Sequence, residues 1–189
     1  PVGGFRGIMH VVQLSTQKGF YGGEVHLRDL AVGLGERDHR GTAIVPPGSR
    51  LAGQLPGAGV TAIEIPLVDW FEPVGMASLV RALRSLRPDV LHVHTPRDYY
   101  VAAVATLGTG ICPVATRHQL RPIALPALKR PFLDRLQAVI AVSRAVRDGL
   151  LATGLPARKL VTIPKMRPYV YQAVALDNPA AYPLLPGRI

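Results

Sequence analysis

Short apolar runs rich in β-branched residues alternate along this chain with segments whose apolar residues recur every three or four positions. Residues 8–14 (IMHVVQL) form the first run, and the next segment carries a helical stripe made of Leu27, Leu30, Ala31 and Leu34. Such runs are typical of buried strands, and such stripes are typical of amphipathic helices. Repeated alternation of the two argues against all-α and all-β folds and predicts an α/β fold.

The predicted elements follow one another in regular order. We expect strands at residues 8–14, 41–45, 60–65, 89–94, 113–116, 138–142 and 160–163. We expect helices from Gly22-Gly23 to about Gly35, at residues 76–86 and 98–107, and from an N-cap at Ser143 to about Thr153. This order predicts a doubly wound, mostly parallel Rossmann-like sheet with helices on both faces and right-handed crossovers.

The periodicity fails at Pro164, where the composition also changes. Five prolines fall in the 26 residues from Pro164 to the end of the chain. Proline lacks a backbone donor and interrupts both helices and central strands. We therefore expect a Rossmann-like domain over residues 1–164 and an irregular, proline-rich tail over residues 165–189, not a second domain.

The overall composition limits the class of protein. Hydrophobic residues make up 48% of the chain and charged residues 18%, which is typical of globular rather than disordered proteins. No apolar run approaches the roughly 20 residues that a membrane-spanning helix needs. A single cysteine, Cys112, excludes an internal disulfide framework and fits a reducing compartment. We expect a cytoplasmic protein, with peripheral attachment at the inner membrane face left open.

The net charge of +10 is concentrated in the second part of the chain. Residues 1–116 carry ten Lys and Arg against nine Asp and Glu, whereas residues 117–189 carry twelve against three. This asymmetry indicates an anionic partner, such as a phosphate ligand, nucleic acid or an acidic membrane surface. Aromatic residues are sparse in residues 117–189 and no nucleic-acid motif occurs there, so we expect no nucleic-acid partner. Residues 120–136 are either a basic amphipathic surface for a lipid phosphate or membrane, or a loop and helix packed on the sheet.

Ligands of doubly wound sheets bind beyond the carboxyl ends of the strands, close to the switch in strand order. This rule predicts that loops 15–23, 94–98 and 116–122 lie along one rim. Gly22 and Gly23 stand between a strand and a helix, where backbone amides can approach a phosphate closely. The G-x-G-x-x-G and P-loop patterns are absent, so an ordinary tight turn remains the alternative for these glycines.

Two groups of histidines follow predicted strands. His118 comes after the strand at 113–116, where it can bond a sugar hydroxyl or a phosphate, with Arg117 beside it as an anion clamp. A surface-loop histidine is the alternative. His92 and His94 face the same side of one strand. No third metal ligand with suitable spacing follows them, so we expect a core histidine at 92, a rim histidine at 94 and no metal.

The other histidines and the loop after His94 complete the set of candidates. We expect a structural role for His10, and solvated helix positions for His26 and His39. Residues 94–98, which include Thr95, Arg97 and Asp98, turn from strand to helix and form a candidate acceptor-contact loop.

Five segments in the right order resemble the N-terminal domain of GT-B-fold glycosyltransferases of family 4. They are residues 22–34 (GGEVH with D-L-A-x-x-L), 89–94 (DVLHVH), 113–118 (PVATRH), 138–143 (AVIAVS) and 161–164 (VTIP). The resemblance covers roughly residues 8–164. It implies a retaining transferase that moves a sugar from a nucleotide-sugar donor to an acceptor without a required metal or other cofactor.

The resemblance also implies roles for individual residues. Gly22 and Gly23 would approach the donor diphosphate, and His118 would be the catalytic residue beside the transferred sugar. The acceptor, lipid-linked or anionic, would be held by the cationic region after residue 117 and by the loop after residue 93. The expected acceptor contacts are His94, Thr95, Arg97, Asp98, Arg117 and Arg121.

The chain departs from the family pattern at Pro164, which is followed by Lys165-Met166-Arg167 instead of Asn-Gly and an acidic residue. The C-terminal donor-binding domain, with its cationic diphosphate clamp and Glu-x7-Glu motif, is missing from this sequence. We therefore expect weak donor binding and little turnover by this chain unless that domain is supplied in cis or in trans. A non-catalytic Rossmann-like binding domain and half of a GT-B sugar-nucleotide epimerase are the alternatives.

Overall fold

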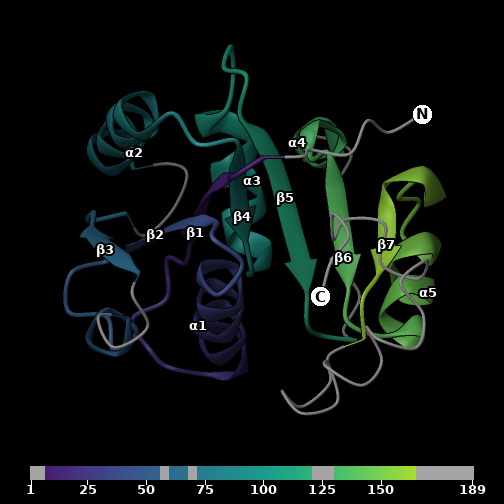
Figure 1. Ribbon diagram of the computed structural model, residues 1–189. Helices are drawn as coiled ribbons and strands as arrows, with labels where there is room; N and C mark the ends of the chain where they lie inside the picture. The colour runs from purple at the N-terminus through teal and green to yellow at the C-terminus, as the bar shows by residue number, and fades with distance from the viewer. Residues whose placement is uncertain (1–6, 56–59, 68–71, 121–129, 165–189) are drawn as a thin grey trace.

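A seven-stranded, all-parallel sheet forms the centre of the computed structural model (Figure 1), which describes residues 7–55, 60–67, 72–120 and 130–164. The strand order is β3-β2-β1-β4-β5-β6-β7. The strands are β1 (His10–Leu14), β2 (Arg40–Val45), β3 (Thr61–Glu64), β4 (Val90–Val93), β5 (Cys112–Arg117), β6 (Ala138–Ala141) and β7 (Leu160–Thr162). The predicted fold class and the predicted strands are therefore confirmed, with small differences at the strand ends.

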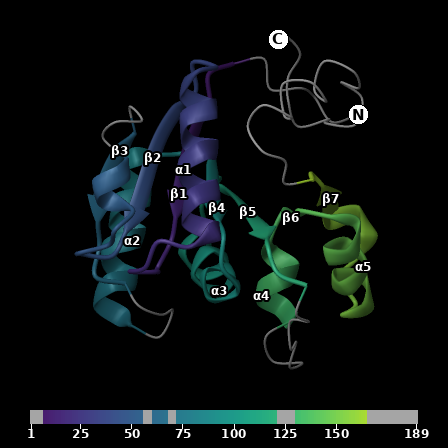
Figure 2. The ribbon, with the colours of Figure 1, turned by 90° about the horizontal axis from the view of Figure 1, so that it is seen from below.

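Helices connect the strands and cover both faces of the sheet. They are α1 (Gly22–Gly35), α2 (Pro73–Leu86), α3 (Pro96–Ala105), α4 (Arg130–Arg135) and α5 (Arg144–Ala152), with short 3-10 turns η1 (Ala52–Gln54) and η4 (Ala157–Lys159). Seen from below, α1 lies on one side of the sheet, and α3 and α4 lie on the other (Figure 2).

The switch in strand order lies between β1 and β4. The chain runs outward from β1 to β2 and β3, and then returns to place β4 on the other side of β1. In-register pairing sets Gln13 of β1 beside His92 of β4, and His92 beside Val114 of β5. The carboxyl ends of β1, β4 and β5 are thus adjacent, as a ligand site at the switch point requires.

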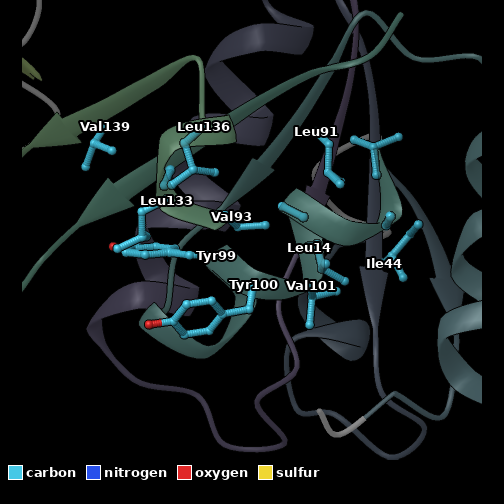
Figure 3. Close-up of a cluster of buried hydrophobic side chains, with 14 of the residues drawn as sticks. Leu14, Ile44, Leu91, Val93, Tyr99, Tyr100, Val101, Leu133, Leu136 and Val139 are labelled. Carbon is cyan, nitrogen blue, oxygen red and sulfur yellow. The ribbon is translucent and has the colours of Figure 1, made fainter. Parts of the chain in front are cut away.

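Alternating side chains divide the interior into two apolar clusters. Leu91 and Val93 of β4 point toward α3 and contact a large cluster that also contains Leu14, Ile44 and Tyr99 (Figure 3). The smaller cluster lies under α1, around the helix residues Leu27 and Ala31. Because side chains alternate along a strand, His92, which stands between Leu91 and Val93, points to the other face of the sheet, where α1 lies. His92 therefore lies outside the large apolar cluster.

The helix boundaries follow from capping chemistry. The Ser143 hydroxyl accepts a hydrogen bond of 3.2 Å from the Val146 amide, which confirms the predicted N-cap of α5. Helix α2 begins with Pro73 and ends at Leu86, and its C-cap residue Arg87 has φ 47 and precedes Pro88. Within the described part of the chain, no helix has the length and apolar character needed to cross a bilayer. The predicted tail, residues 165–189, lies outside the described residues.

Candidate active site

Three loops meet at the carboxyl ends of β1, β4 and β5. The loop after β1 leads into the first turn of α1, Thr95 caps the start of α3 after β4, and His118 follows β5 directly. This arrangement confirms that the described parts of loops 15–23, 94–98 and 116–122 lie along one rim.

Two buried carboxylates fix the loop after β1. Glu24 is 2% exposed and accepts bonds from the Ser15 hydroxyl (3.1 Å) and the Tyr21 amide (3.0 Å). Asp98 is fully buried and accepts a 2.6 Å bond from the Thr16 hydroxyl and a 3.4 Å bond from the Thr16 amide. Both ends of the loop are therefore tied to helix N-termini, where negative charge is favourable.

The first turn of α1 leaves room beside its backbone. A Cβ atom added to Gly23 would meet no atom within 4 Å, and the φ angle of Gly23 is not in the left-handed region. Neither packing nor backbone conformation therefore requires glycine at this position. Glycine in a helix costs roughly 0.5–1 kcal/mol relative to alanine. The open space leaves room for an anion to approach the backbone amides at this helix end.

Four of the six histidines of the chain gather beside this turn, and we call them the histidine cluster: His26, His92, His94 and His118. The His26 ring lies 4.9 Å from that of His118 and 5.7 Å from that of His94. The His94 ring lies 5.8 Å from that of His118 and 4.4 Å from that of His92. One helix and two strands thus bring imidazoles that are far apart in sequence to one place.

His92 of β4 and His94, which directly follows β4, are held by buried polar partners. The Nε2 atom of His94 lies 2.8 Å from Oε1 of Gln13, and Nε2 of His92 lies 2.8 Å from Oγ1 of Thr116. Because an amide oxygen only accepts, His94 donates through Nε2, and its Nδ1 atom carries the lone pair. Burial, with a smaller effect of the neighbouring His26 and His118, lowers the pKa of His92 to about 3. His92 is therefore a neutral core histidine, as predicted.

The other predicted acceptor contacts lie in different surroundings. Arg97 is exposed and Thr95 is half-buried at the start of α3. Arg117 is 4% exposed, and its guanidinium lies beside the Tyr99 hydroxyl, where it opposes the rise in the pKa of Tyr99 that burial causes. The structure does not bring Arg117 into the histidine cluster, so the predicted anion clamp beside His118 is not formed.

Asp98 also differs from its predicted role. Both of its carboxylate oxygens are occupied by Thr16, and burial raises its pKa to about 6 against the opposing hydrogen bonds. We therefore assign Asp98 a positioning role in place of the predicted contact with an acceptor. Arg121 lies outside the described residues.

Among the remaining histidines, the predicted surroundings of one are confirmed and those of two are wrong. His10 is buried, bonded to Thr42 and to the carbonyl of Leu86, so its structural role is confirmed. His26 was predicted to be solvated, but it is half-buried in the cluster, because the start of α1 brings its ring to 5.7 Å from that of His94. His39 lies after α1, not on it, and its Nδ1 accepts from the Met9 amide.

The sequence profile of Glycosyltransferase Family 4 matches residues 20–166, which include the first turn of α1 and the histidine cluster. The chain belongs to glycosyltransferase family 4. A search of curated protein sequences found no relative.

Solved structures of GT-B glycosyltransferases and of a sugar-nucleotide epimerase share the fold. A glycosyltransferase from Rickettsia africae superposes with a TM-score of 0.70 at 18% identity, covering 96% of this chain and 51% of that one. Anabaena Alr3699/HepE, solved with UDP and glucose, gives 0.67 at 17%, covering 92% and 51%. A UDP-GlcNAc 2-epimerase from Neisseria meningitidis, bound to UDP-GlcNAc, gives 0.60 at 14%, covering 94% and 54%. The family-4 chain described here spans about half the length of these proteins.

Proposed function

We propose that this family-4 chain is the N-terminal domain of a retaining glycosyltransferase, which moves a sugar from a nucleotide-sugar donor to an acceptor. The observation that carries the proposal is the meeting of the open first turn of α1 with the histidine cluster, at the switch point of the sheet. A diphosphate and the sugar attached to it need an anion site and hydroxyl-binding groups next to each other, and these two features supply them.

The first turn of α1 is the proposed diphosphate site. Gly22 and Gly23 expose backbone amides at the positive end of a 14-residue helix. The chemical task of the site is to stabilise the negative charge that develops on the departing diphosphate. Glu24, whose side chain points back to Ser15 and Tyr21, holds this turn in place without presenting its carboxylate to the phosphate.

His118 is the proposed catalytic residue beside the transferred sugar. It is half-buried and stacks 5.8 Å from His94, and both of its ring nitrogens are shielded from solvent, which favours a fixed position of the imidazole. Catalysis would depend on positioning and on leaving-group stabilisation more than on a strong base, and it would need no metal. His94, Thr95, Arg97 and the basic region around Arg121 are the proposed acceptor side, with a lipid-linked or anionic acceptor.

The donor is proposed to be a UDP-sugar, because Anabaena HepE and the Neisseria epimerase, which share the fold, were solved with UDP compounds. The family match favours transfer over epimerisation, which remains the second candidate. Since this chain spans about half of those proteins, we expect it to bind a UDP-sugar weakly on its own and to show little turnover.

The test is an NMR titration of the chain with UDP-glucose, followed through backbone amide shifts. We expect weak, saturable binding, in the millimolar range, with the largest shifts at Gly22, Gly23 and His118. Shifts confined to other surfaces would overturn the proposed site. Micromolar affinity in a calorimetric titration would contradict the expectation that most donor contacts come from another domain.

A further inference from the structure

We propose that His26, His94 and His118 form a zinc-binding site. This inference goes beyond the proposed sugar transfer and does not rest on it. The three imidazoles come from α1, from the end of β4 and from the residue after β5. Spacing along the sequence does not indicate such a site. His26 and His118 are far from His94 in the sequence, and only the fold brings them close to it.

The positions of the nitrogen atoms fit one ion. One ring nitrogen from each of the three residues lies within 4.8 Å of the other two. A point between three atoms with this greatest separation is at most about 2.8 Å from each, and zinc–imidazole bonds are about 2.0–2.1 Å long. Rotations that move each ring by less than about 1 Å would therefore complete the coordination.

The surroundings of His94 are those of a metal ligand. Its Nε2–H group donates to Gln13 Oε1 at 2.8 Å, and Gln13 is 1% exposed. This bond orients the His94 ring, and an amide or carboxylate oxygen behind a ligating histidine is a common outer-shell partner. His26 and His118 are half-buried as residues, whereas Nδ1 of His94 and both ring nitrogens of His118 are shielded from solvent, so an ion held here would be enclosed between the rings.

The ligand type selects the ion. Three neutral imidazoles and no carboxylate suit zinc, which takes three protein ligands and leaves its fourth position to water. Magnesium and calcium require oxygen ligands, and the three residues offer none. An ion held here would occupy the imidazole that the proposed function places beside the sugar, so zinc would inhibit transfer if that function holds.

Zinc binding is tested by calorimetric titration of the tag-free, full-length chain with zinc chloride, with magnesium chloride as the comparison ion. We expect one zinc ion per chain and no magnesium binding. His26→Gln and His118→Gln should each weaken zinc binding at least about tenfold. The matched control is His39→Gln, which removes a histidine outside the cluster and should change the affinity less than about twofold.

Two outcomes would overturn the site: zinc binding that does not saturate, and equal losses in the cluster variants and the His39 control. Cobalt provides an independent readout, because a four-coordinate Co²⁺ site absorbs visible light much more strongly than a six-coordinate one. The strong absorption should appear with the unchanged chain and be lost in His26→Gln. His26 and His118 are half-buried, so the test does not depend on substituting the buried His94, and circular dichroism checks that each variant is folded.

Discussion

The Thr16 hydroxyl and the Asp98 carboxylate form a 2.6 Å hydrogen bond although 82 positions separate the two residues. The bond joins the loop after β1 to the first turn of α3. Two of the three loops at the rim are therefore fixed relative to each other by a carboxylate that is completely shielded from solvent. Burial of this carboxylate also makes the stability of the fold depend on pH.

Asp98→Asn should remove a pH-dependent destabilisation. The folded-state pKa of Asp98 is about 6, above its ordinary value of 3.8, so the folded chain keeps this proton when the unfolded chain has lost it. The free energy of unfolding therefore falls as the pH rises from about 4 to about 7, by on the order of 1–3 kcal/mol. Urea denaturation at pH 4 and pH 7 measures this change. Parallel pH dependences for Asp98→Asn and the unchanged chain would show that Asp98 does not titrate in this range.

His92→Gln should remove a loss of stability that the unchanged chain shows in acid. The pKa of His92 is lowered from 6.5 to about 3 in the folded chain, so below pH 6.5 the unfolded chain takes up a proton that the folded chain does not. The unchanged chain then loses stability as the pH falls from about 7 to about 4, by on the order of 2–3 kcal/mol from this residue. The same denaturation series should give a smaller acid loss for His92→Gln. A loss of equal size in both proteins would mean that the imidazole is protonated inside the fold.

Gly75→Ala should destabilise the chain despite the helical preference of alanine. A Cβ at this position of α2 would lie 2.6 Å from the Pro66 carbonyl oxygen and 3.0 Å from the Leu67 Cα, and these backbone atoms cannot move aside easily. We expect a loss of about 1–3 kcal/mol in the free energy of unfolding. Gly33→Ala in α1 is the matched control, since its Cβ would meet only Arg37 at 3.6 Å. Thermal denaturation should show a gain of roughly 0.5–1 kcal/mol for the control, and equal effects of the two substitutions would contradict the packing argument.

Gly23→Ala should leave stability intact and weaken binding of UDP. The added Cβ has open space around it in the chain itself, but it would stand where the proposed diphosphate approaches the amides. The NMR shifts that UDP causes at His118 should fall at least severalfold. Gly35→Ala, at the other end of α1, also adds a Cβ with no atom within 4 Å and should leave these shifts unchanged. Unaltered UDP binding by Gly23→Ala would place the diphosphate elsewhere.

The strands and the rim could be predicted from the sequence because parallel topology fixes where strand ends lie. His94 and His118 each follow a strand, so their meeting at one edge follows from the α/β pattern alone. His26 lies on a helix next to Leu27 of the apolar stripe, and its surroundings depend on the rotation and tilt of α1 over the sheet. Periodicity does not determine either quantity, and His26 was therefore predicted to be solvated.

The buried partners of the site residues also could not be predicted from the sequence pattern. Asp98 and Arg117 stand beside predicted site residues, and both were assigned to the acceptor on that basis. Asp98 instead bonds to Thr16, and Arg117 lies beside Tyr99. Whether a charged residue near a strand end faces a ligand or a buried partner depends on contacts between distant segments, which the local sequence does not specify.

Helix α1 carries the open glycine turn at its beginning and His26 one turn further on. Since a helix moves as a stiff rod, any sliding or tilting of α1 displaces the amides of the first turn and the His26 imidazole together. The proposed phosphate position and one imidazole of the histidine cluster therefore belong to a single structural element.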